Sequence, residues 1–156
     1  MRHIISVLLE NESGALSRVA GLFSARSFNI ESLSVAPSED VTASRMTIVT
    51  SGNDAVIEQI VKQLDKLVDV IEVSEITSDE HIEREIAFVK IDDKSINKKM
   101  MNNFSKNEFL KIHKTKNKEI IIECVDSPEK INIFLDSVKK IAVKIVRSGA
   151  VGINSN

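Results

Sequence analysis

Apolar residues recur with two different periods along the first half of the chain. Ile5, Val7 and Leu9 occupy every second position, which predicts a β-strand. In the stretch ALSRVAGLFSAR, apolar residues recur every three or four positions, which predicts an amphipathic helix over residues 14–26. Two strands, a second helix and a β-branched strand follow. Residues 1–77 are therefore predicted to have the order strand–helix–strand–strand–helix–strand.

The second half repeats this order with a weaker pattern. We predict strands in EIAFVKI, EFLKIHK, KEIIIECVD and VKIVRSGAVGI, and a helix without a clean apolar stripe over residues 94–103. Ser127 and Pro128 suit the N-cap and first position of a last helix. Each half is then a ferredoxin-like βαββαβ unit, and the protein is α+β. The polar stretch 78–83 is the predicted linker, and 84–156 the second domain.

Composition indicates an ordinary soluble protein. Of the 156 residues, 42% are hydrophobic and 28% are charged. No apolar run is long enough to span a membrane, and the first residues do not resemble a signal peptide, so we expect a cytoplasmic location without membrane contact. The only cysteine, Cys124, lies in an apolar alternating run. It cannot form an internal disulfide, and we interpret it as a buried structural thiol.

Charge differs between the two halves. Residues 1–80 hold 6 Lys and Arg against 13 Asp and Glu, whereas residues 81–156 hold 15 against 10. Two units with different faces or partners would give this division. The lysines between positions 94 and 118 raise the possibility of nucleic-acid binding. However, they are scattered, and no Tyr or Trp is present to stack on bases, so a solvated face is favoured and no nucleic-acid partner is predicted.

No catalytic or metal-binding constellation is visible. His3, His81 and His113 are far apart and lack ligand spacing. No dinucleotide or phosphate-binding loop occurs. The pair Asp92 and Asp93 lies at a strand end without a partner base, where a solvated turn is the simpler interpretation. We therefore predict that the chain has no catalytic residues, no metal and no cofactor of its own.

The stretch ENESGAL, residues 10–16, joins the first strand to the first helix. A helix N-terminus presents unpaired N–H groups and partial positive charge, so it can bind a carboxylate without catalytic side chains. Gly14 would allow close approach of a ligand, and Asn11 can both donate and accept. The alternative is that Ser13 simply caps the helix. The residues alone favour the cap.

The residues also resemble a known family. The stretches ISVLLENESGALSRVAGLFSAR, NIESLSVAPSED and SRMTIVTSG closely resemble the small, regulatory subunits of acetohydroxyacid synthase, also called acetolactate synthase. QLDKLVDVIEVSEIT, EREIAFVKI and RSGAVG extend the match. The resemblance is dense over residues 1–91, thin over 92–140, and returns at 145–152. It implies an ACT domain, which binds amino acids, followed by a second ferredoxin-like domain.

The resemblance implies a function that involves a partner. Such subunits have no active site, form homodimers through their ACT domains and bind a catalytic large subunit that carries thiamine diphosphate, Mg²⁺ and FAD. They raise its activity and confer feedback inhibition by valine in branched-chain amino-acid biosynthesis. The competing hypothesis is a free-standing ACT-domain amino-acid sensor that acts on another target. The near-continuous match over residues 1–91 favours the regulatory subunit.

The resemblance also implies a valine site between two chains. One chain supplies the strand-to-helix turn and the other supplies the start of the second strand; carried onto this sequence, the residues are Asn11, Gly14, Ala15 and Leu16, and Asn29 and Ile30. One departure from the family concerns Ser27, where glycine is usual. Glycine there suits a left-handed helix cap, so serine is expected to be strained or to change the turn before Asn29.

Overall fold

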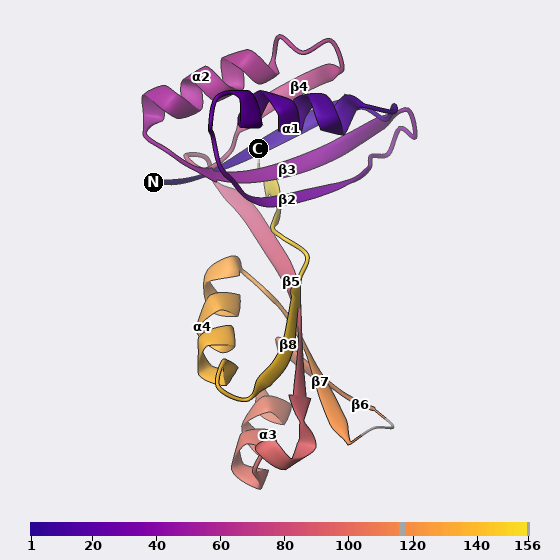
Figure 1. Ribbon diagram of the computed structural model, residues 1–156, viewed down its shortest axis with the longest axis vertical. Helices are drawn as coiled ribbons and strands as arrows, with labels where there is room; N and C mark the ends of the chain where they lie inside the picture. The colour runs from indigo at the N-terminus through magenta and orange to yellow at the C-terminus, as the bar shows by residue number, and fades with distance from the viewer. Residues whose placement is uncertain (116–117, 156) are drawn as a thin grey trace. The chain divides into compact units, whose positions relative to one another are not determined.

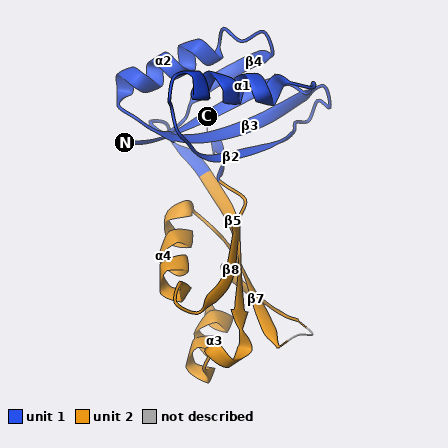
Figure 2. Cartoon of the chain, in the orientation of Figure 1, with its two compact units in different colours: residues 1–82, 150–156 blue, residues 83–149 orange. Residues whose placement is uncertain are grey.

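The computed structural model describes residues 1–115 and 118–155. It consists of two compact units (Figures 1 and 2). The first unit contains residues 1–82 together with 150–156, and the second contains residues 83–149.

The first unit is a four-stranded antiparallel sheet with two helices on one face (Figure 1). Its elements are β1 (Arg2–Glu10), α1 (Ala15–Ala25), β2 (Ile30–Pro37), β3 (Ala43–Ser51), α2 (Asp54–Leu64) and β4 (Val70–Glu75). The strand order is β2-β3-β1-β4, so β2 and β4 are the edge strands of this path. The predicted βαββαβ order is confirmed.

The period-two pattern of β1 defines the two faces of this sheet. Ile5, Val7 and Leu9 are at most 2% exposed and pack under the helices, where Val19 and Phe23 of α1 meet them. Because successive side chains of a strand point to opposite faces, the residues between them face away from the helices. Asn53 caps the second helix, because its side chain accepts a hydrogen bond from the Val56 N–H at 3.0 Å.

The end of α1 explains why Ser27 matters. Ser27 has φ 57°, in the left-handed region. Its N–H donates to the Ser24 carbonyl at 3.1 Å, and the next N–H, of Phe28, donates to the Phe23 carbonyl at 2.9 Å. The Phe23 and Phe28 rings pack edge to face, 6.4 Å apart. These contacts form a Schellman motif, and Ser27 occupies the left-handed position that usually holds glycine.

The second unit has the same topology. Its elements are β5 (His81–Asp92), the short 3₁₀ helix η1 (Asp93–Ser95), α3 (Lys98–Lys106), β6 (Leu110–Lys114), β7 (Glu119–Asp126), α4 (Pro128–Val138) and β8 (Ala142–Arg147). The strand order is β6-β7-β5-β8. Cys124 is fully buried in this core, and burial raises the pKa of its thiol to about 11. The predicted fold class, α+β with two ferredoxin-like units, is confirmed.

The C-terminal stretch differs from the prediction. VKIVRSGAVGI is not one strand, because β8 ends at Arg147 and a separate strand, β9 (Val151–Asn154), follows. Gly149, with φ 79°, breaks the run. By their contacts, residues 150–156 belong to the first compact unit. The stretch 78–83, predicted as a linker, already contains the start of β5, and β9 pairs with β5.

Candidate functional site

The turn between β1 and α1 is held by the loop that precedes β3. The Asn11 N–H donates to the Thr42 carbonyl at 2.7 Å, and the Asn11 side-chain Nδ2 donates to the Val41 carbonyl at 3.0 Å. The side chain is nevertheless exposed. Its Oδ1 is an acceptor that has no hydrogen-bond partner among the described residues.

Gly14, not Ser13, is the N-cap of α1. Gly14 has φ 94°, in the left-handed region, and no side-chain hydrogen bond caps the helix among the residues that the structure describes. The interpretation of Ser13 as a cap is therefore wrong. The left-handed backbone at Gly14 carries the chain into the helix without presenting a capping oxygen. The Ala15 N–H donates to the Glu12 carbonyl at 3.3 Å, and no described side chain caps the first N–H groups of α1, which suits the binding of an anion.

An ion pair lies directly beneath this turn. Arg18 binds Asp69 through two hydrogen bonds, one of them between Nη2 and Oδ1 at 2.6 Å. The Arg18 hydrogen bonds outweigh burial and lower the pKa of Asp69, whose side chain is 6% exposed. The Asp69 carbonyl also accepts from the Glu10 N–H at 2.8 Å. A Cβ on Gly14 would lie 3.0 Å from Arg18 Nη1, so two independent constraints favour glycine there.

A small cavity of about 230 Å³ opens at the turn. It is lined by Leu9, Glu10, Asn11, Glu12, Ala15, Leu16, Val35, Ala36, Pro37 and Ser44. Three of the predicted site residues, Asn11, Ala15 and Leu16, therefore meet at one cavity, and the end of β2 forms its other wall. Ala15 is 2% exposed and Leu16 is 41% exposed. The volume lies below the usual range for a complete ligand pocket.

Asn29 and Ile30 lie at the opposite end of the sheet. Ile30 is level with Thr50 of β3, whereas Pro37, at the other end of β2, is level with Ser44. The Asn29 side chain is exposed, and its backbone carbonyl accepts from the Thr50 hydroxyl at 2.6 Å. One chain therefore does not bring the two predicted halves of the site together.

Comparisons with known proteins agree in both halves of the chain. Residues 5–72 match the AHAS small subunit-like ACT domain, and residues 84–156 match the family described as small subunit of acetolactate synthase. The acetolactate synthase isozyme 3 small subunit of Salmonella typhimurium is 47% identical, with 99% of this chain and 96% of the relative covered. This chain belongs to the acetolactate synthase small-subunit family.

More distant members show the same full-length similarity. The probable acetolactate synthase small subunit of Archaeoglobus fulgidus is 40% identical over 97% of this chain and 95% of its own length. The crystal structure of the Thermotoga maritima small subunit superposes with a TM-score of 0.87 at 32% identity, covering 100% of this chain and 98% of that one. The family therefore has this two-unit fold along its whole length.

Within this family fold, the described residues contain no group of three or more His, Cys, Asp and Glu side chains that could hold a metal ion. Nor is any helix in residues 1–115 and 118–155 long and apolar enough to cross a membrane.

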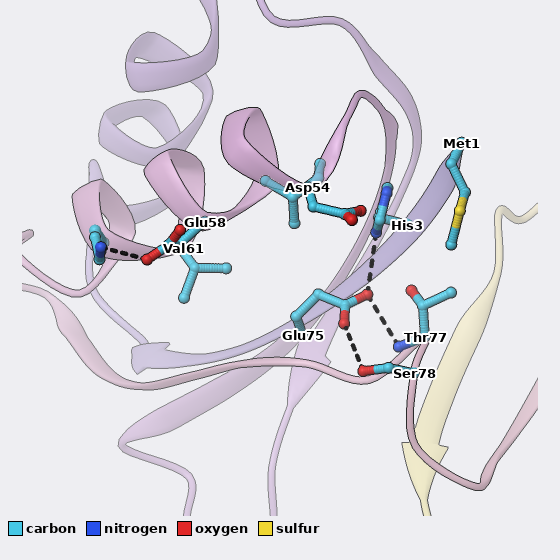
Figure 3. Close-up of a pocket in the computed structure, with 10 residues that line it drawn as sticks. Met1, His3, Asp54, Glu58, Val61, Glu75, Thr77 and Ser78 are labelled. Carbon is cyan, nitrogen blue, oxygen red and sulfur yellow. Dashed lines mark hydrogen bonds and ion pairs between the residues drawn. The ribbon is translucent and has the colours of Figure 1, made fainter.

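A larger cavity, of about 530 Å³, lies at the start of β1. Figure 3 shows its wall, where the His3 imidazole is directed at Glu75, with Nδ1 3.4 Å from Oε1. His3 is 5% exposed, and its Nε2 has no partner among the described residues. Burial alone would raise the pKa of Glu75, but hydrogen bonds from Thr77, His3 and Ser78 together hold it below its ordinary value.

Sequence reasoning missed this cavity. His3 and Glu75 are 72 residues apart, and no spacing rule connects them before the sheet register is known. The pairing of β1 with β4 is what brings them together.

Proposed function

We propose that the protein is the regulatory subunit of an acetolactate synthase, that it activates the catalytic large subunit, and that it confers feedback inhibition by valine in branched-chain amino-acid biosynthesis. The observation that carries the valine part is the turn at Gly14, where a helix start without a side-chain cap meets a cavity. Full-length similarity to small subunits supports the partner.

A homodimer through β2 would complete the site. β2 is an edge strand, and edge strands present unpaired backbone groups that can pair with a second copy. Antiparallel pairing of two β2 strands about a twofold axis places the Ile30 end of one strand beside the Pro37 end of the other. Asn29 and Ile30 of one chain would then close the turn cavity of its partner, and each dimer would hold two sites.

The chemistry of valine suits such a site. Its carboxylate would accept from the N–H groups at Gly14, Ala15 and Leu16, where the helix dipole favours negative charge. Asn29 of the second chain would accept from the ammonium through its side-chain oxygen. The isopropyl group would pack on the apolar side chains that line the cavity. A small apolar pocket with a few placed polar groups is the usual form of a site for a small ligand.

The catalytic chemistry belongs to the partner in this proposal. The large subunit would supply thiamine diphosphate, Mg²⁺ and FAD, and this chain would act without cofactors of its own. The purified chain should form no acetolactate from pyruvate with these cofactors. Its addition should raise the rate of the cognate large subunit, and valine should then lower that rate.

Co-expression with the cognate large subunit tests the proposal. We expect the two chains to co-purify and the complex to lose activity in a valine titration. Acetolactate formation by this chain alone would contradict the assignment of catalysis. If this chain neither binds nor activates the large subunit, a free-standing amino-acid sensor would be favoured instead.

A further inference from the structure

The strand β9 is built into the face of the first sheet that the helices leave open. Gly152 donates from its N–H to the Thr47 hydroxyl at 3.3 Å. A Cβ on Gly152 would lie 3.0 Å from Ile76 Cδ1 and 3.5 Å from Ile4 Cγ2. Ile4 neighbours the helix-facing Ile5 along β1, so it points to the opposite face. A side chain at position 152 would therefore have to push the Ile76 side chain aside, and the larger the side chain, the less closely the strand could approach.

The same segment is attached to the strand that carries half of the proposed effector site. The Ala150 N–H donates to the Ser32 hydroxyl at 2.9 Å, and Ala150 is 2% exposed. Ser32 lies in β2, two residues after Ile30. This hydrogen bond ties the C-terminal segment to the start of β2.

β9 is also one of the two chain connections to the second unit. The first connection is β5, and β9 pairs with it; the Ser155 N–H donates to the Glu80 carbonyl at 2.8 Å. Within the second unit, the residues that leave for β9 are fixed to β5 as well. Ser148 exchanges two hydrogen bonds with the Ile86 backbone, at 3.0 and 3.1 Å.

Just before this point the exit from the second unit is fixed by a charged pair. Arg147 makes two hydrogen bonds of 2.7 Å to Glu85, which is 5% exposed. Paired guanidinium and carboxylate groups in this geometry are among the stronger hydrogen bonds in proteins. Gly149 then provides the left-handed turn between this exit and β9.

We propose that β9 couples valine binding to inhibition. In the seated position, β9 packs against the first sheet with its hydrogen bonds to Ser32 and Thr47 formed, and this seating transmits a change in the order of β2 to the second unit. This inference rests on the proposed valine site. β9 suits the task because it is only four residues long, and Val151 and Ile153 are more than half exposed. Short elements with few buried contacts open at low free-energy cost, so a ligand that orders β2 can bias whether β9 is seated.

Coupling of this kind is reciprocal, which makes it measurable in the small subunit alone. If β9 seating favours valine binding, valine must favour β9 seating by the same factor. Valine should therefore slow hydrogen exchange of the Ala150 and Gly152 amides. In Ser32→Ala, which removes the acceptor on β2, valine should no longer slow the Ala150 amide, whereas Ser34→Ala, on the same face of β2, should behave as wild type.

The reconstituted complex separates coupling from binding. Gly152→Val should displace β9, and its small subunit should still bind valine in calorimetry, weakened by no more than about tenfold. At saturating valine its complex should keep most of its activity, where the wild-type complex loses it. Thr47→Val keeps the shape of the side chain and removes the acceptor. Its complex should also keep more activity at saturating valine than the wild-type complex does. Ile153→Thr, at an exposed site of the same strand, is the matched control.

Three results would overturn the inference. The first is inhibition of the Gly152→Val complex by valine to the wild-type extent, and the second is a complete loss of valine binding by Gly152→Val. The third is equal hydrogen exchange of the wild-type Ala150 and Gly152 amides with and without valine. A wild-type chain that itself binds no valine would be a different failure, because it would remove the proposed valine site.

Discussion

The same strand-to-helix turn occurs once in each unit, and the two copies differ in how the helix begins. In the first unit, α1 starts at Gly14 without a side-chain cap. In the second unit, η1 intervenes after β5, with Asp92 accepting from the Lys94 N–H at 3.0 Å. The following helix, α3, is capped by Asn97, which accepts from the Met100 N–H at 2.9 Å.

This difference shows that the shared fold does not by itself determine which turn suits a ligand. Both turns connect a first strand to a first helix in a ferredoxin-like unit, so topology alone gives neither of them a ligand. The capped turn satisfies its own helix start with protein oxygens, and no close-approach glycine is present there. At the uncapped turn the described side chains provide no such oxygen; the Ala15 N–H has a long backbone hydrogen bond of 3.3 Å to the Glu12 carbonyl, and the proposed function gives the open helix start to a ligand. A function assigned to this fold therefore depends on the site rather than on the architecture.

The largest expected effect comes from adding a charge at the open turn. Asn11→Asp keeps the size of the side chain and adds a negative charge beside the N–H groups proposed to bind the valine carboxylate; it also removes the Nδ2 hydrogen bond to the Val41 carbonyl. Repulsion of the valine carboxylate should cost about as much as one charge-assisted contact, roughly 1.5–3 kcal/mol, so valine affinity should fall about tenfold to hundredfold. Valine titration of the reconstituted complex measures it.

The matched control is the same change at the capped turn. Asn97→Asp keeps a capping oxygen in the second unit and should leave valine inhibition at the wild-type level. Equal effects of the two substitutions would show that the open turn has no special role. Gly14→Asp is a poorer test, because Gly14 has φ 94° and faces Arg18, so its loss would also strain the turn.

A smaller effect is expected from Asn29→Ala. Among the described residues, Asn29 is held through its backbone carbonyl, which accepts from the Thr50 hydroxyl and which the substitution keeps. Loss of one hydrogen bond to the valine ammonium should weaken valine affinity by about tenfold or less, while activation of the large subunit stays unchanged. Calorimetric titration of the small subunit gives the affinity directly. Unchanged affinity would remove Asn29 from the site.

A substitution at the capped turn should change the stability of the second unit and leave valine binding unchanged. Asn97→Ala removes the side-chain cap of α3 and should destabilise the second unit by about 1 kcal/mol. Valine affinity should stay the same, because this helix start serves no ligand. Chemical denaturation of the full chain, followed together with valine binding, checks both parts. A loss of valine binding without unfolding would contradict the contrast between the two turns.

The smallest effect concerns the end of α1. A non-glycine residue in the left-handed region costs about 1–2 kcal/mol, and part of the gain from glycine is offset by its entropy in the unfolded chain. Ser27→Gly should therefore stabilise the protein by roughly 0.5–1 kcal/mol, seen as a rise of a few degrees in the unfolding temperature. A lower unfolding temperature would show that the serine is favourable in this motif.

The sequence predicts local structure well where the local signals are strong. Residues 1–77 have the predicted order of strands and helices, and Pro128 is the first residue of α4, as predicted. The resemblance names the family that the comparisons confirm. The interpretation of Ser13 as the helix cap was wrong. A polar residue before a helix is the usual cap, but here the left-handed Gly14 is the N-cap, one residue later.

Features that depend on distant contacts could not be predicted in this way. Nothing local in SGAVG shows that the run divides at Gly149 and that Ala150 bonds to Ser32, 118 residues away. The pairing of His3 with Glu75 likewise needs the sheet register. The valine site, with its residues from two chains, stays a prediction, because the two halves lie at opposite ends of one sheet.

Mixing two defective chains tests the shared site most directly. Asn11→Asp damages the turn, and Asn29→Lys places a cation where the valine ammonium should bind; each variant alone should bind valine poorly. In a dimer of one chain of each kind, one site carries both changes and the other carries neither. Equal co-expression should therefore restore about one quarter of the wild-type valine sites by calorimetry, with wild-type affinity. If the mixture binds no more valine than the separate variants, the site does not combine residues 11 and 29 from different chains.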